Sequence, residues 1–171
     1  MRMSARGKIG LFSIIVMTVV VFRLYFFGTK VPFPSNLLVS FFAPWNTVTY
    51  PGWEHGVPNK PMGIDNLNLF YPYRNLSIEL IKKGKLPLWN PYNFTGNVLF
   101  ANFQSAIFYP LSLLYFLLPM VDAWSVLVII QLILAGFFTY LYGRSLKLSE
   151  SASWFGGFVF AFSGEMIVWM G

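Results

Sequence analysis

Long apolar runs, separated by one extensive polar region, dominate the pattern of this chain. Three runs, at 9–27, 123–142 and 152–170, are long enough to cross a bilayer, because a helix rises about 1.5 Å per residue and the hydrocarbon core is roughly 30 Å thick. A fourth run, 106–119, would reach only about 21 Å as a helix and contains the helix-breaking Pro110. The pattern therefore predicts three transmembrane helices and one shorter apolar segment that does not cross.

The basic residues indicate how these helices are oriented. Basic side chains lie in residues 1–8, before the first run, and the short loop 143–151 carries Arg144 and Lys147. Short basic segments beside transmembrane helices remain in the cytoplasm. Residues 28–105 are then a long extracytoplasmic loop, and the short apolar run after it is an interfacial or re-entrant segment on the same side.

The first apolar run shares some features with a secretory signal. It is too long for one, however, and no small-x-small cleavage site follows it in "GTKVPFPS" (28–35). We therefore interpret it as an uncleaved anchor with a cytoplasmic N-terminus. The expected fold class is an all-α, multi-pass protein of the plasma membrane.

Composition supports this interpretation and excludes several functions. Hydrophobic residues make up 56% of the chain and charged residues 11%, about half the charge of a soluble domain. The chain has no cysteine, which excludes disulfide and thiolate chemistry, and its single histidine, His55, excludes a multi-histidine metal cluster. The net charge of +6 is not gathered into a basic arm or helix face, so nucleic acid is not an expected partner.

The long loop contains one clear helix signal. Pro72 suits the first turn of a helix, and Glu79 and Lys83 have the i,i+4 spacing and order that stabilise one. We expect an amphipathic helix over 72–83 that lies on the bilayer surface. The stretch "LPLWNPYNFTG" (86–96) follows, and its prolines and glycine predict turns at the membrane surface.

Four short motifs, in a fixed order, resemble a known family. They are "FYPYR" (70–74), "LPLWNPY" (86–92), "ANFQSA" (101–106) and "AFSG" (161–164). From residue 63 onward the chain resembles YfhO-type bacterial membrane proteins, which belong to the GT-C superfamily of integral-membrane glycosyltransferases. The resemblance implies the start of a GT-C-type polytopic fold. Because such proteins have many more spans, it also implies an N-terminal fragment that is inactive alone.

The resemblance further implies transfer of a sugar from a polyprenyl-phosphate-linked donor to an envelope polysaccharide, lipid or protein on the outer membrane face. Such a reaction needs a carboxylate that accepts a proton or holds a metal ion. Asp65, just before "FYPYR", stands at the family's acidic position and is the main catalytic candidate. The cofactor stays open, with a divalent metal ion on Asp65 as the candidate. The alternatives for Asp65 are a helix cap before Asn66 or an ion pair with Arg74.

Glu165 is the second catalytic candidate, because a carboxylate inside an apolar span is costly and points to function. The alternative is a glutamate that simply reaches the outer water. Arg74 is the candidate for binding the donor phosphate, and contact with lipid headgroups is its alternative. Glu54 and His55, in a turn rich in proline and glycine, are interpreted as solvated loop residues, with an assisting base or a weak metal ligand as the alternative.

The remaining binding candidates are aromatic and amide residues of the loop motifs. Aromatic rings stack on sugar faces or anchor at the membrane interface, and amides bind sugar hydroxyls or satisfy turn backbone. This set comprises Trp89, Asn90, Tyr92, Asn102 and Gln104.

Two non-enzymatic classes remain as alternatives: a transporter or flippase for lipid-linked sugars, and a small structural membrane subunit. Transporters usually place their polar residues near the bilayer midplane on broken helices. Here the polar residues gather in the loop 28–105, which favours the enzyme.

Overall fold

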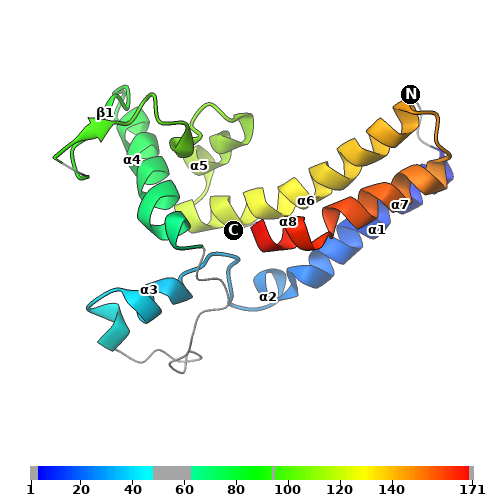
Figure 1. Cartoon of the computed structure of the whole chain (residues 1–171), viewed down its shortest axis with the longest axis horizontal. Coiled ribbons are helices and arrows are strands. Elements are labelled where there is room, and N and C mark those ends of the chain that lie inside the picture. The colour runs from blue at the N-terminus through cyan, green and yellow to red at the C-terminus, as the bar shows by residue number, and fades with distance from the viewer. Residues whose placement is uncertain (1–3, 48–62, 94, 170–171) are drawn as a thin grey trace. The chain divides into compact units, whose positions relative to one another are not determined.

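The computed structural model describes residues 4–47, 63–93 and 95–169. The chain divides into two compact units (Figure 1). The first comprises Met1–Pro32 and Trp124–Gly171, and the second comprises Phe33–Ala123. Both are built mainly from helices.

The first unit is a small helical bundle. Figure 1 shows its three longest helices side by side. Its elements are α1 (Ala5–Val21), α2 (Arg23–Phe26), α7 (Glu150–Ala161), α8 (Gly164–Trp169) and the greater part of α6 (Met120–Ser145).

Two helical stretches are long and apolar enough to cross a membrane, Met120–Ser145 and Glu150–Trp169. They coincide with the second and third predicted spans. The first predicted span, 9–27, is not one helix: α1 ends at Val21 because Phe22 leaves the helical conformation (φ −95°, ψ 23°), and α2 follows. The apolar helix Gly7–Val21 is shorter than the other two, so a crossing by the first run stays a prediction.

Small residues allow the helices of the first unit to approach closely. A Cβ atom added to Gly157 would lie 2.4 Å from the carbonyl oxygen of Gly136, so α6 and α7 are nearly in backbone contact there. A Cβ at Gly10 would lie 2.2 Å from Cγ of Trp154, so that indole packs directly on α1. Trp154 also stacks on Tyr140, with ring centroids 4.1 Å apart. Glycine at such positions is the usual means of close helix packing in membranes.

One end of this bundle is joined by polar contacts. The Ser4 hydroxyl accepts a hydrogen bond from the Gly7 amide, 3.4 Å away, and so caps α1. The same hydroxyl donates to the Glu150 carboxylate at the start of α7. The Tyr140 hydroxyl, on α6, donates to Oε1 of Glu150 at 3.5 Å. Glu150 therefore links three helices.

The second unit consists of short elements around one longer helix. The π-helix η3 runs directly into α4, and β1 and β2 pair antiparallel with Trp89 opposite Val98. The elements are α3 (Asn36–Phe41), η1 (Trp45–Thr47), η3 (Asn66–Phe70), α4 (Tyr71–Lys82), β1 (Trp89–Asn90), β2 (Asn97–Val98), η4 (Phe103–Ser105), η5 (Pro110–Leu113) and α5 (Leu114–Leu117).

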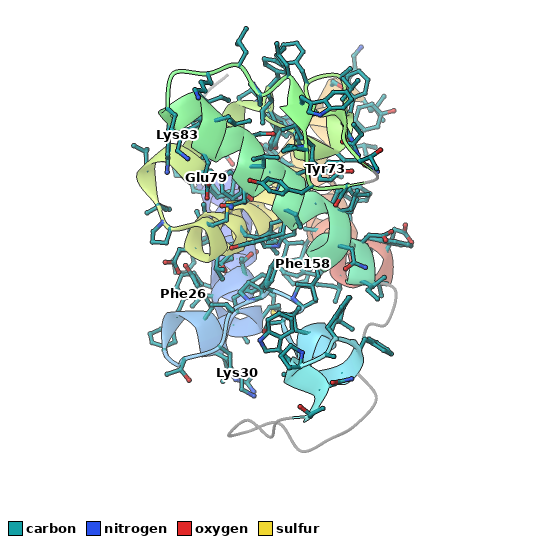
Figure 2. All side chains as sticks on the ribbon, turned by 90° about the vertical axis from the view of Figure 1, so that its left-hand side faces the viewer. Phe26, Lys30, Tyr73, Glu79, Lys83 and Phe158 are labelled. Carbon is teal, nitrogen blue, oxygen red and sulfur yellow. The ribbon has the colours of Figure 1, made fainter. Side chains whose placement is uncertain are left out.

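The expected amphipathic helix 72–83 corresponds to α4, but its apolar side is not left open for a bilayer. Tyr73 and Ile78 are buried inside the unit, where α4 packs against η4 and α5. The exposed side carries Glu79 and Lys83, which are labelled with Tyr73 in Figure 2. The open face of α4 is therefore polar.

The short apolar run 106–119 forms no long helix. It folds into the 3-10 helix η5 and the single turn α5, which ends where Leu118 becomes extended before Pro119. The described residues of 86–96 form bends and turns around the two-residue strand β1, and Gly96 adopts a φ of +111° that other residues rarely adopt.

Candidate functional site

The second unit brings together three of the motifs that carry the family resemblance. Tyr73, from "FYPYR", is buried, and its hydroxyl oxygen accepts two side-chain hydrogen bonds. The donors are Nδ2 of Asn93, at 3.2 Å, and Nδ2 of Asn97, at 2.9 Å. Because Asn93 lies in the connection between β1 and β2 and Asn97 is the first residue of β2, Tyr73 holds this hairpin against α4.

Arg74, the next residue of α4, joins the helix both to "ANFQSA" and to α5, which follows it. Its Nε donates to the carbonyl oxygen of Ser105 at 3.2 Å, and its Nη1 donates to the hydroxyl oxygen of Tyr115 at 2.8 Å. The guanidinium carbon also lies 5.2 Å from the centroid of the Tyr115 ring. The position of this cation is thus fixed by two elements outside its own helix.

Burial raises the pKa of the Tyr115 hydroxyl above its ordinary value. The Arg74 charge and hydrogen bond act in the opposite direction, but burial is the larger effect. Tyr115 therefore stays protonated at neutral pH and can accept from Arg74 while it keeps its own proton.

The amide candidates differ in what they do. Oδ1 of Asn90, a buried residue, accepts from the backbone amide of Tyr92 at 3.0 Å. Oδ1 of Asn102 accepts from the backbone amide of Gln104 at 2.9 Å, which caps η4. Both contacts satisfy turn backbone, as the alternative interpretation expected. Gln104 itself is exposed.

The aromatic candidates are open to a ligand. Trp89 and Tyr92 are both exposed. The Trp89 ring packs against Gly96 so closely that a Cβ there would lie 2.5 Å from ring atoms Cζ2 and Nε1. That contact fixes the orientation of the indole, while about half of the residue's surface remains free.

The acidic candidates lie in different units. Asp65 is exposed and has a helical backbone (φ −64°, ψ −27°) without a side-chain cap hydrogen bond, so the helix-cap alternative is wrong. Glu165 is exposed in the first turn of α8, just after the helical stretch breaks at Phe162 (φ −104°, ψ 20°). The catalytic roles of Asp65 and Glu165 stay predictions.

Metal binding has little support in the part of the chain that the structure describes. No group of three or more histidine or acidic side chains occurs among residues 4–47, 63–93 and 95–169. Glu54 and His55 lie outside the described residues. Asp65 is thus a metal-ligand candidate without two further such ligands in the described segments.

Sequence analysis missed Tyr73, Asn97 and Tyr115. A signal existed for Tyr115, because a half-buried arginine in the "FYPYR" helix requires acceptors. The apolar run 106–119 offers only a few hydroxyl groups, and that of Tyr115 is one of them.

Comparisons with protein-family models, with curated proteins and with solved structures found no match to this chain. Function is therefore inferred from the motifs and from the contacts described above.

Proposed function

We propose that this chain is the N-terminal part of a multi-pass, GT-C-type glycosyltransferase of the plasma membrane. Its N-terminus lies in the cytoplasm and its second unit lies on the extracytoplasmic side. The reaction is transfer of a sugar from a polyprenyl-phosphate-linked donor to a cell-envelope acceptor.

One observation supports this proposal above the others. Segments that carry or directly follow three of these motifs, although separated along the sequence, are linked by the side chains of two adjacent residues of "FYPYR". Tyr73 binds Asn93 and Asn97, which follow "LPLWNPY" in the hairpin, and Arg74 binds Ser105 of "ANFQSA". A set of motifs that converges in this way is expected of a binding site rather than of a linker.

The proposed roles follow from residue chemistry. The Asp65 carboxylate accepts the proton of the acceptor hydroxyl as that oxygen bonds to the anomeric carbon, and the lipid phosphate leaves with the electron pair of the broken bond. Arg74, already oriented by Tyr115, stabilises the negative charge of the leaving phosphate. Trp89 and Tyr92 offer exposed rings to a sugar face.

Asp65→Asn in the full-length protein tests the proposal. Transfer of a radiolabelled sugar from the polyprenyl-phosphate donor in isolated membranes should fall by at least about 100-fold, because an amide cannot accept the proton. Glu79→Gln is the matched control, since it removes another exposed carboxylate of the same unit. Unchanged transfer by Asp65→Asn protein that inserts at the normal level would refute the assignment.

One observation favours a transporter for lipid-linked sugars as the second candidate. The apolar stretch Glu150–Trp169 is interrupted at Phe162, three residues before Glu165, and transporters use such broken helices at their substrate sites. Reconstituted full-length protein and its Glu165→Gln variant distinguish the two. A transporter moves a fluorescent lipid-linked sugar across the bilayer without any acceptor, and Glu165→Gln slows that movement.

A further inference from the structure

The run Pro110–Leu117, formed by η5 and α5, has polar groups inside and apolar groups outside. Ser112 and Tyr115 have 0% and 1% of their surface exposed, whereas Leu113 and Leu117 have 67% and 79% exposed. A short helix on a water-soluble surface normally has the opposite arrangement.

Each of the two buried polar side chains makes a hydrogen bond inside the unit, which favours this orientation of the run. The Ser112 hydroxyl donates to the carbonyl oxygen of Ala106 at 2.7 Å. The Tyr115 hydroxyl accepts from Nη1 of Arg74 at 2.8 Å. Turning the leucines inward would break both hydrogen bonds and leave buried polar groups unsatisfied, which is costly. The leucines are therefore held outward by the interior of the unit.

Two features indicate what covers these leucines. Leu118 and Pro119 lead directly from the run into α6, a helix long and apolar enough to cross a membrane. The ammonium group of Lys82 lies 6.0 Å from the centroid of the Phe116 ring, between the two leucines in the sequence. Leucine beside lysine, next to a spanning helix, suits the boundary between acyl chains and anionic headgroups.

We propose that Pro110–Leu117 lies in the plane of the membrane interface. Leu113 and Leu117 enter the acyl-chain boundary, and Lys82 contacts the phosphates of anionic lipids. The partner is thus the lipid surface that surrounds α6, and not a second copy of the chain. This proposal requires membrane insertion of α6 but does not depend on sugar transfer.

The absence of cysteine from the chain allows a direct test on the full-length protein in bilayer nanodiscs, provided that any cysteines beyond this chain are replaced. Single cysteines are introduced as Leu113→Cys, Leu117→Cys and, as the control, Glu79→Cys on the polar face of α4. Each is labelled with a nitroxide, and its collisions with oxygen and with a water-soluble nickel chelate are measured. Labels at 113 and 117 should collide several-fold more with oxygen than with the chelate, and the label at 79 should show the reverse.

Two results would overturn the proposal. Labels at 113 and 117 that collide with the chelate as the label at 79 does would place the run in water. Protection of both positions from both reagents would mean that protein, such as a second copy, covers the leucines.

The role of Lys82 is tested with the label at 117. Replacing phosphatidylcholine by a phosphatidylglycerol mixture should lower its collisions with the chelate, and Lys82→Gln should abolish that difference. Lys30→Gln, which removes the same charge from the first unit, should preserve it. Equal responses of the two glutamine variants would refute the headgroup contact of Lys82.

Discussion

Arg74 and Tyr115 lie 41 residues apart in sequence, yet Nη1 of Arg74 donates a hydrogen bond of 2.8 Å to the Tyr115 hydroxyl. The arginine is on α4 and the tyrosine is on α5, so this bond connects the helix of the "FYPYR" motif with the segment that leads into α6. Both the binding site and the interfacial run that we propose depend on it.

Removal of this bond should destabilise the second unit. Tyr115→Phe removes the hydroxyl that accepts from Nη1 of Arg74 in a partly buried setting, which should cost about 1–3 kcal/mol. Thermal unfolding of the purified protein in detergent measures the change. Tyr109→Phe is the control, because that tyrosine is exposed; a loss of equal size in both variants would contradict the prediction.

Stability should also depend on pH through the same tyrosine. Because burial raises the pKa of folded Tyr115, the unfolded chain loses this proton first as pH rises, near its ordinary pKa of about 10. Stability from this group is therefore complete below that pH and is lost as pH rises through the higher, folded pKa. Unfolding midpoints measured from neutral to strongly alkaline pH should fall less for Tyr115→Phe than for the wild type. Midpoints of the two proteins that fall in parallel with pH would contradict this prediction.

Gly96→Ala should disturb the hairpin of the loop motifs. Gly96 has a φ of +111°, and the new Cβ would lie 2.5 Å from the Trp89 ring, so backbone strain and a steric clash add to about 2–4 kcal/mol. Gly84→Ala is a matched control, since Gly84 also has a positive φ (+70°) but nothing within 4 Å of the added atom. The difference between the two losses of stability reports the contact with Trp89 together with the larger backbone strain at a φ of +111°, and a zero difference would contradict the prediction.

Two adjacent glycines of α7 offer a similar comparison. Gly157→Ala would bring a Cβ to 2.4 Å from the Gly136 carbonyl oxygen and force α6 and α7 apart, at a cost of about 1–3 kcal/mol. At Gly156 the added atom meets nothing within 4 Å, so Gly156→Ala should leave stability unchanged or raise it slightly. Retention of monodisperse protein after heating in detergent ranks the two variants. Equal behaviour would show that α6 and α7 do not pack through these glycines.

The apolar pattern predicted much of the helical structure, because spanning helices and α4 have strong local signals. The pattern did not predict the break at Phe22, because no proline or glycine lies within five residues of it. The break at Phe162 did have a local signal in the following Ser163 and Gly164, but the apolar residues around it outweighed that signal.

Fewer contacts of the candidate site than of the fold could be predicted from the sequence. The exposure of Trp89 and Tyr92 and the turn contacts of Asn90 and Asn102 follow from local chemistry, which the sequence shows directly. The partners of Arg74 are set by tertiary packing across tens of residues. No spacing rule in a single sequence specifies such pairs.

The contact between Ser4 and Glu150 joins residues 146 positions apart. During synthesis the ribosome must therefore add nearly all of the described chain before the start of α1 meets its partner on α7. The second unit is continuous in sequence from Phe33 to Ala123. It can therefore complete its own contacts before α7 has been synthesised and can bind α1. Biogenesis of this protein should accordingly begin with the middle of the chain and end with closure of its two flanks.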